Sequence, residues 1–243
     1  MHRRMPSHRG GYDMKKLIQF VFIRTLPVLF AFLFLGIAFG LLLQRAGYNV
    51  VWAFLISTFV YAGSMQFVLI PFLGTDMSIF TVILMTLSIN SRHIFYGLSF
   101  IEKFKRMGKA YPYMIFSLTD ETYSLLCSTK IPADLDEKKV FFGIALFTHV
   151  YWIAGSVAGS LAGELITFDT TGIEFAMTAL FVVIFIEQWL SSKNHIPAVA
   201  GLLCAVVSLL IFGPGSFILP ALIASIAIIM AFKNSIQNKE AVI

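Results

Sequence analysis

Apolar segments long enough to cross a lipid bilayer follow one another along almost the whole chain. A helix of about 20 residues spans the hydrocarbon core of a membrane. The segments cover approximately residues 25–43, 50–73, 77–101, 113–128, 140–163, 175–190, 196–212 and 216–232. The fourth and sixth are short and carry charges. The sequence therefore predicts an all-α polytopic membrane protein with about 7–8 transmembrane or partly re-entrant helices.

The composition argues against a water-soluble globule. Hydrophobic residues make up 58% of the chain and charged residues 13%, whereas charged residues are about 25% of a typical soluble domain. Lysine and arginine outnumber aspartate and glutamate, 18 to 13, but they cluster beside the apolar segments, where they suit a membrane surface. We therefore expect the lipid bilayer, and no nucleic acid, as a partner of this basic chain.

Polar residues are concentrated at the two ends of the chain. We expect a basic N-terminal tail over residues 1–24, a single transmembrane transporter domain over residues 25–232 and a C-terminal tail over residues 233–243. A cleavable signal peptide is the alternative for the N-terminus. It is disfavoured because the first apolar segment is long and many others follow it.

Charges in the loops predict the orientation of the chain. Basic residues precede the first apolar segment and fill the loop over residues 102–112, so both should be cytoplasmic, while the acidic loop over residues 164–174 should lie outside. Three complete crossings would put the 102–112 loop outside, so one early segment should enter and return, or break. We expect the break in the third segment, which the polar run Ser88–His93 interrupts. The alternative is that His93 lies near a membrane edge and Arg92 extends to the headgroups.

Glycine residues four positions apart occur in the first and fifth segments. Small residues at this spacing lie on one face of a helix and let two helix backbones approach closely in lipid. The predicted helix-packing residues are Gly36, Gly40, Gly155 and Gly159. Each glycine pair precedes a segment that contains a glutamine, Gln66 or Gln188. This pattern is consistent with an internal repeat of two three-helix halves.

Several polar side chains fall within the apolar segments. A charge at the centre of a bilayer costs about 2.5–3.5 kcal/mol or more, so such residues are candidates for function. The candidate substrate- or ion-pathway residues are Gly63, Gln66, Asn90, Arg92, His93, Asp120, Glu121, Glu187 and Gln188. Arg92 and Glu121 lie on polar stripes of neighbouring segments and would face each other, with a purely structural ion pair as the alternative. Asp120 would cap a helix or pair with the basic loop, and His149 would make a local hydrogen bond rather than transfer protons.

Motifs of soluble enzymes are absent from the sequence. The chain has no GxSxG, HExxH, Walker A or GxGxxG stretch. A membrane enzyme built on His93, Asp120 and Glu121 would need an activated nucleophile, and no base is placed for Ser117 or Ser124. The histidines and cysteines have no metal-ligand spacing. We therefore expect a carrier without enzymatic activity, cofactor or metal.

Four stretches of the chain resemble one known family. They are Tyr61–Gln66 (YAGSMQ), Asn90–Ser99 (NSRHIFYGLS), Leu118–Glu121 (LTDE) and Gly172–Trp189. Together with the glycine pairs, they make the chain similar to the AzlC family, the large subunits of bacterial branched-chain amino-acid exporters. The resemblance implies a permease of the bacterial cytoplasmic membrane that exports leucine, isoleucine and valine, with methionine as a further candidate. It also implies a small AzlD-type membrane subunit as a partner.

The source of energy follows only indirectly from the sequence. The chain contains no nucleotide-binding motif, so we expect the proton gradient, rather than ATP, to drive export. A channel or pore-forming subunit for small solutes is the alternative function. Saturation and counterflow in proteoliposomes would distinguish a carrier from a channel.

Overall fold

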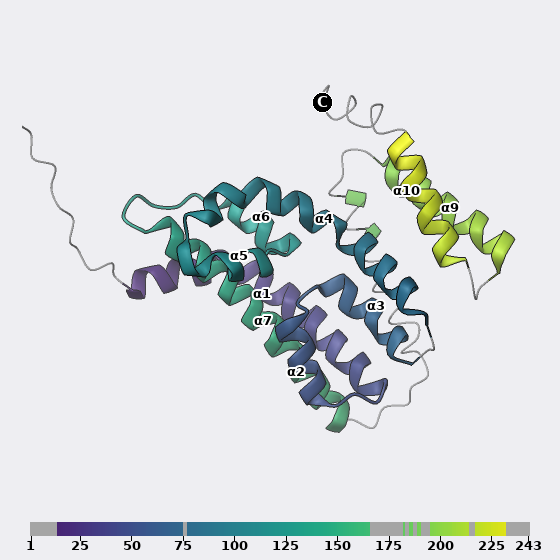
Figure 1. Ribbon diagram of the computed structural model, residues 1–243. Helices are drawn as coiled ribbons and strands as arrows, with labels where there is room; N and C mark the ends of the chain where they lie inside the picture. The colour runs from purple at the N-terminus through teal and green to yellow at the C-terminus, as the bar shows by residue number, and fades with distance from the viewer. Residues whose placement is uncertain are drawn as a thin grey trace, which may run out of the picture. The chain divides into compact units, whose positions relative to one another are not determined.

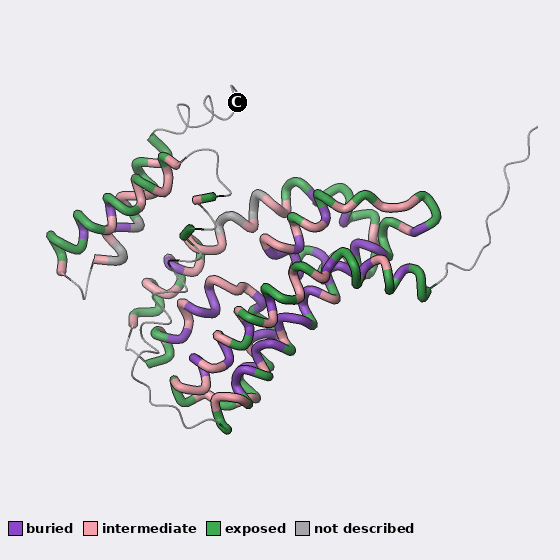
Figure 2. Tube along the Cα trace, turned by 180° about the vertical axis from the view of Figure 1, so that it is seen from behind, coloured by how far each residue is buried: buried purple, intermediate pink, exposed green. Residues whose placement is uncertain are grey.

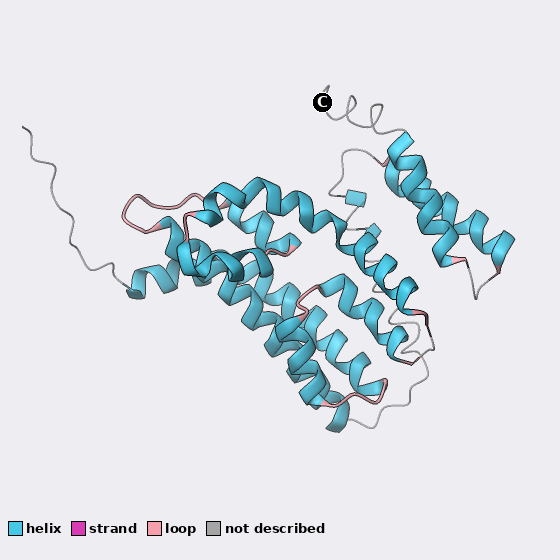
Figure 3. Cartoon of the chain, viewed as in Figure 1, coloured by secondary structure: helices cyan, strands magenta, loops and turns pink. Residues whose placement is uncertain are grey.

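Helices make up all of the regular secondary structure in the residues that the computed structural model describes (Figure 1, Figure 3). These residues are 14–74, 77–165, 182, 185–186, 189–190, 195–213 and 217–231. The chain divides into two compact units, one formed by Met1–Asp76 with Ile89–Thr167 and the other by Met77–Ser88 with Phe168–Ile243. Over the described residues, the predicted all-α class is confirmed.

Two long helices form the centre of the first unit. α1 covers Met14–Arg45 (32 residues) and α7 covers Glu137–Leu165 (29 residues), and both are apolar enough to cross a membrane. Figure 2 shows many of their residues in the buried class. α1 begins before the expected residue 25, because Leu17 and Val21 belong to the buried core. The two predicted tails and the single transmembrane domain otherwise remain predictions.

Glycine residues let α1 and α7 touch backbone to backbone. A Cβ atom added to Gly40 would lie 2.0 Å from a carbonyl oxygen of α7, and one added to Gly159 would lie 2.1 Å from a carbonyl oxygen of α1. Added to Gly36, it would lie 3.0 Å from the Cα atom of Gly155. Real Cβ atoms essentially never come closer than 3.0 Å to such atoms. The structure therefore places all four predicted packing glycines at the contact between these helices.

The two central helices run parallel. Near their first residues, Lys16 of α1 forms an ion pair with Asp134, which precedes α7. Near their last residues, the Ser160 hydroxyl donates a hydrogen bond of 3.1 Å to Oε1 of Gln44. Lysines gather where both helices begin, and we call this the basic end and the opposite one the far end. The hydrogen bond from Lys16 holds the pKa of the exposed Asp134 carboxyl below its usual range.

The second apolar segment is a helical hairpin rather than one helix. α2 covers Val50–Phe59 and α3 covers Gly63–Leu73, and between them Tyr61 has a φ of 41°, in the left-handed region. The hairpin returns to the end at which it starts, since the Tyr48 hydroxyl donates a hydrogen bond of 3.3 Å to the carbonyl of Leu73. We call α2 and α3 the first hairpin, which extends from the far end (Figure 1).

The fourth apolar segment forms a second hairpin, made of α5 and α6, at the basic end. The short 3-10 helix η1 at Gly108–Ala110 leads into α5 at Tyr111–Phe116, and α6 covers Asp120–Ser128. Both helices pack on the basic-end halves of α1 and α7 through one apolar cluster. Its members include Leu17, Val21, Met114, Leu118, Leu126, Val140, Phe141 and Ile144.

The third apolar segment is the unbroken helix α4, Ile79–Lys105, so the predicted break at Ser88–His93 is wrong. The polar run does not unwind the helix, because the Ser88 hydroxyl donates a hydrogen bond of 2.8 Å to the Leu84 carbonyl inside it. The segment that turns back on itself is the second. This arrangement still places the basic 102–112 loop at the same end as the basic N-terminus. α4 ends there, and its Lys103 lies 3.7 Å from Glu137 at the start of α7.

Large apolar side chains are exposed on both units. In the second unit, α9 (Ile196–Phe212) packs against α10 (Ile218–Ala231). The exposed apolar residues of α1 and α9 include Phe30, Phe34, Leu203, Leu210 and Ile211. Water-soluble proteins rarely expose so much apolar surface, so these faces suit lipid. The expected segment over residues 175–190 lies mostly outside the described residues, so the number of spans and the internal repeat remain predictions.

Replacement of the packing glycines should weaken the contact between α1 and α7. We expect Gly40→Ala and Gly159→Ala each to cost about 1–3 kcal/mol of stability, because the added methyl group forces the backbones apart. The melting temperature of the purified protein in detergent measures the effect. Gly201→Ala in α9 is the matched control, because nothing lies within 4 Å of its added Cβ. Equal melting temperatures for all three variants would contradict the backbone contact.

Cysteine labelling tests whether the first hairpin re-enters. In a chain with Cys127 and Cys204 replaced by serine, Ala46→Cys and Gly74→Cys should react with an impermeant thiol reagent from the same side of the membrane. Lys109→Cys should react from the opposite side, because α4 returns the chain to the basic end. All three positions are exposed. Labelling of positions 46 and 74 from opposite sides would show that the second segment crosses completely.

Candidate functional site

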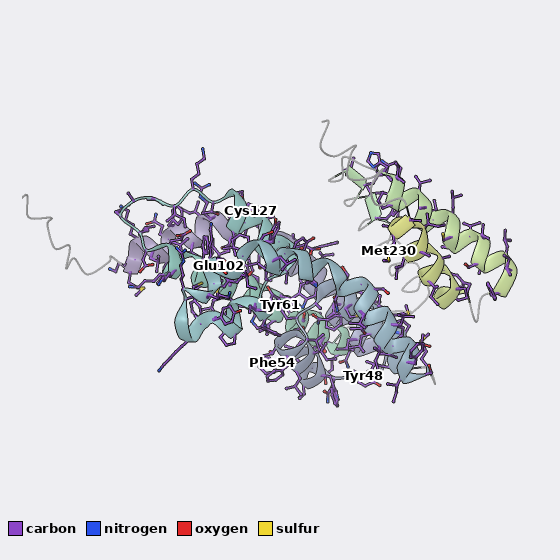
Figure 4. The ribbon with its side chains drawn as sticks, turned by 45° about the horizontal axis from the view of Figure 1, so that its top comes forward. Tyr48, Phe54, Tyr61, Glu102, Cys127 and Met230 are labelled. Atoms are coloured by element: carbon purple, nitrogen blue, oxygen red, sulfur yellow. The ribbon has the colours of Figure 1, made fainter. Side chains whose placement is uncertain are left out.

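The tips of the two hairpins meet against the middle of α7. The Tyr61 ring, at the tip of the first hairpin, lies 4.2 Å from the His149 ring of α7. Phe116, at the tip of the second hairpin, lies 6.1 Å from the Tyr61 ring and 5.7 Å from His149. Figure 4 shows Tyr61 between Tyr48, at the far end, and Glu102, near the basic end. The two broken segments therefore converge at mid-length of the first unit.

His149 joins the two hairpins by hydrogen bonds. Its Nε2 lies 3.3 Å from the carbonyl oxygen of Ser57 in α2, and its Nδ1 lies 3.2 Å from the hydroxyl of Tyr113 in α5. A carbonyl oxygen only accepts, so we assign the proton to Nε2 and let Nδ1 accept from Tyr113. One neutral tautomer satisfies both contacts. The local hydrogen-bonding role predicted for His149 is confirmed.

Threonine hydroxyls fasten the second hairpin to α7. Thr119 caps α6, because its hydroxyl accepts a hydrogen bond of 3.3 Å from the backbone N–H of Thr122. The Thr122 hydroxyl lies 3.1 Å from that of Thr148, which donates to the Ile144 carbonyl at 3.0 Å. All three threonines are buried. This network fixes the start of α6 beside His149.

Three buried hydroxyls at or next to the hairpin tips make no hydrogen bond of normal geometry to a described residue, those of Thr58, Tyr61 and Ser117. Tyr61 is 4% exposed and Ser117 is 0% exposed. Sequence reasoning noted Tyr61 only as part of a longer motif, and Ser117 only as a nucleophile for which no base is placed. A single sequence contains no signal for a left-handed tyrosine, although the following Gly63 indicated that the helix was weak there.

Gln66 holds the tip of the first hairpin on α7. Its side chain is fully buried, and Oε1 accepts hydrogen bonds from Nε1 of Trp152 at 2.9 Å and from the N–H of Ala62 at 3.2 Å. Its amide nitrogen donates to the Ser57 hydroxyl at 3.4 Å. Gly63 lies against the Trp152 ring, 3.5 Å from the position of an added Cβ. Both lone pairs of the Gln66 Oε1 atom are occupied by protein donors. A direct contact of Gln66 or Gly63 with a ligand remains a prediction.

Polar residues of α4 and α6 face each other. His93 Nε2 lies 3.7 Å from Oδ1 of Asp120, and the Tyr96 and Tyr123 rings stack at 4.6 Å. Asp120 thus lies beside His93, because the first turn of α6 lies beside α4, and its pairing with the basic loop remains a prediction. Glu121 occupies the next position of that turn.

The remaining candidates are only partly visible. Asn90 lies in α4 and is half-buried. Arg92 lies in the same helix, but its side chain is outside the described part of the structure, so the Arg92–Glu121 pair remains a prediction. Glu187 and Gln188 lie outside the described residues altogether. The structure therefore brings together Gly63, Gln66, His93, Asp120 and Glu121 around the two hairpin tips and the start of α6.

Loss of the Trp152–Gln66 hydrogen bond should destabilise the first hairpin. We expect Trp152→Phe to cost about 1–3 kcal/mol, because a buried amide oxygen loses its shortest donor. The melting temperature in detergent should fall accordingly. Trp52→Phe in α2 is the control, since Trp52 is 50% exposed. If the two variants melt at the same temperature, the Gln66 contact does not hold the hairpin in place.

Three comparisons place the chain among known proteins. The model of the AzlC protein family matches residues 27–166, which include both hairpins. The branched-chain amino acid transport protein AzlC of Bacillus subtilis is 38% identical over 216 residues, 89% of this chain and 85% of that protein. An uncharacterized membrane protein of Haemophilus influenzae is 42% identical over 82% of each chain, and the inner membrane protein YgaZ of Escherichia coli is 25% identical over 86% of this chain and 88% of its own length. No solved structure matches the chain significantly.

Proposed function

The chain belongs to the AzlC family of membrane transport proteins, and from this premise we propose that it exports branched-chain amino acids. The similarity to a branched-chain amino acid transport protein covers 89% of the chain, and the family match over residues 27–166 includes both hairpins. This similarity is the observation that carries the proposal. The substrates would be leucine, isoleucine and valine, with methionine as a further candidate.

The meeting point of the hairpins suits a small apolar zwitterion. Interrupted helices supply unpaired backbone dipoles at mid-membrane, where many carriers bind their substrates. Aromatic rings surround the same point and would accept an aliphatic side chain. These rings belong to Tyr61, Tyr113 and Phe116, whose centroids lie 4.2, 6.0 and 5.7 Å from that of His149. The charged groups and the apolar side chain of an amino acid would therefore both have suitable contacts at this point.

The charge distribution supports one orientation of the chain in the membrane. The basic end holds the start of α1, the end of α4 and the start of α7, with Lys16, Lys103 and Lys105 among its charges. Under the positive-inside rule this end would face the cytoplasm, and the first hairpin would enter from outside. We propose the bacterial cytoplasmic membrane as the location, with the N-terminus inside.

A small AzlD-type membrane subunit is the proposed partner. The test is uptake of labelled leucine into inverted vesicles that contain the chain alone or together with this subunit. We expect saturable uptake and counterflow when both are present. Uptake that does not saturate and shows no counterflow would indicate a channel, and no uptake in either preparation would contradict the proposed function.

Substrate selectivity should follow side-chain chemistry. One methylene group changes binding by only about 1–3 kcal/mol in an apolar pocket, so leucine, isoleucine, valine and methionine should compete within about two orders of magnitude. Lysine and glutamate should not compete, because their charged ends would be buried without a partner. Competition for labelled leucine in inverted vesicles measures this. Efficient transport of lysine or glutamate would refute the assignment.

Glu121 is the proposed carrier of the coupling proton. It lies next to Asp120 in the first turn of α6, directly after the tip of the second hairpin. We expect Glu121→Gln to keep leucine exchange but to lose its acceleration by a pH gradient, with both rates normalised to protein in the membrane. Glu102→Gln, at an exposed position of α4, is the control. Unchanged gradient-driven flux in Glu121→Gln would exclude this role and leave Asp120 or Glu187 as candidates.

A further inference from the structure

We propose that the hydroxyls of Tyr61 and Ser117, together with the N-terminus of α3, bind the carboxylate of the transported amino acid. This inference rests on the proposed function and specifies its site. One hydroxyl comes from each hairpin tip, and the aromatic contact between Tyr61 and Phe116 holds the tips together at 6.1 Å between ring centroids. The carboxylate would thus be bound between the two interrupted segments.

Tyr61 combines three unusual features. In the described part of the chain it is the only non-glycine residue with a positive φ, 41°, a conformation that is strained for a bulky side chain. Its ring is fixed by His149 and Phe116. Its buried hydroxyl lies beside those of Thr122 and Thr148, but it has the geometry of a hydrogen bond to neither of them, and the two threonine hydroxyls contact each other at 3.1 Å. The fold therefore maintains a strained residue whose hydroxyl makes no hydrogen bond of normal geometry to a described group.

Ser117 also has a buried hydroxyl, and it lies on the second hairpin. It lies directly before the break between α5 and α6, is 0% exposed, and its hydroxyl makes no hydrogen bond to a described residue. Leaving a buried hydroxyl without a partner is unfavourable, and such groups often contact a ligand. Two such hydroxyls at the two adjoining breaks indicate one shared ligand.

The helix ends give this site a positive and a negative side. α3 has 11 residues, no acidic residue in its first turn, and Ala62 at its N-cap, whose methyl group cannot accept a hydrogen bond. Its N-terminus therefore keeps the partial positive charge that binds anions. α6 instead has Asp120 and Glu121 in its first turn, which suit an ammonium group. The arrangement matches the carboxylate and ammonium of a free amino acid.

Conservative substitutions test the site in the full chain with its small subunit. Tyr61→Phe and Ser117→Ala should each raise the half-saturation concentration for leucine exchange by about tenfold or more, the effect of losing a hydrogen bond to a charged group. Tyr151→Phe is the matched control, because the Tyr151 hydroxyl bonds to Thr25 at 3.1 Å within the core. Its half-saturation concentration should equal that of the wild type. Unchanged half-saturation in both test variants would overturn the proposal.

Thermal stability separates a ligand contact from a structural contact. Without substrate, Tyr61→Phe should melt at or above the wild-type temperature, because it removes a buried hydroxyl that has no partner among the described groups. The rise in melting temperature caused by leucine should shrink in this variant. A lower melting temperature without substrate, together with an unchanged leucine effect, would show that the hydroxyl bonds to the protein instead.

Substrate analogues identify the group that is bound. Leucinamide, which lacks the carboxylate, should compete weakly with leucine in the wild type, and Tyr61→Phe should weaken it no further. An equal loss of leucine and leucinamide binding would contradict the carboxylate assignment. Wild-type protein that fails to exchange leucine would overturn the proposed function itself, whereas wild-type exchange with unaffected variants would overturn this site alone.

Discussion

The backbone contact between α1 and α7 is the constraint on which the first unit depends. Apolar helices in lipid gain little from burying apolar side chains, so close packing of small residues must hold them together. Gly40 and Gly159 allow this packing, because any larger residue would collide with the opposite backbone. The parallel pair then presents one face of α7, with His149 and Trp152, to both hairpins. A change in this contact would move every group of the candidate site.

Interrupted helices within a membrane require protein partners for their free backbone groups. The first break is secured by the Gln66 side chain, which accepts from the Ala62 N–H, and by the Ser57 carbonyl, which contacts His149. The second is secured by the Thr119 cap and its link to Thr148. The chain thus uses most of its buried polar groups to stabilise the breaks. Tyr61 and Ser117 remain available for a substrate among the described residues.

Periodic and compositional signals predicted much of this fold. Apolar segments indicated the helices, glycine spacing identified the residues at the α1–α7 contact, and loop charge predicted that one early segment turns back. The position of the break was wrong, because the polar run Ser88–His93 is satisfied inside α4, whereas Tyr61 is held in its strained conformation by contacts with α7. Gln66 was interpreted as a ligand-binding residue because its hydrogen-bond partner Trp152 is distant in sequence, so the sequence did not show that the two side chains meet. Such long-range contacts leave no local pattern.

The central claim is that substrate binds where the two breaks meet, and protection from chemical modification tests it most directly. In a chain with Cys127 and Cys204 replaced by serine, Ser117→Cys should react slowly with a small methanethiosulfonate reagent. Saturating leucine should slow the reaction further, and leucinamide should not. Ser128→Cys, at the exposed end of α6 in the same hairpin, should react at a rate that leucine does not change. Equal rates for Ser117→Cys with and without leucine, in a variant that still exchanges leucine, would contradict the account.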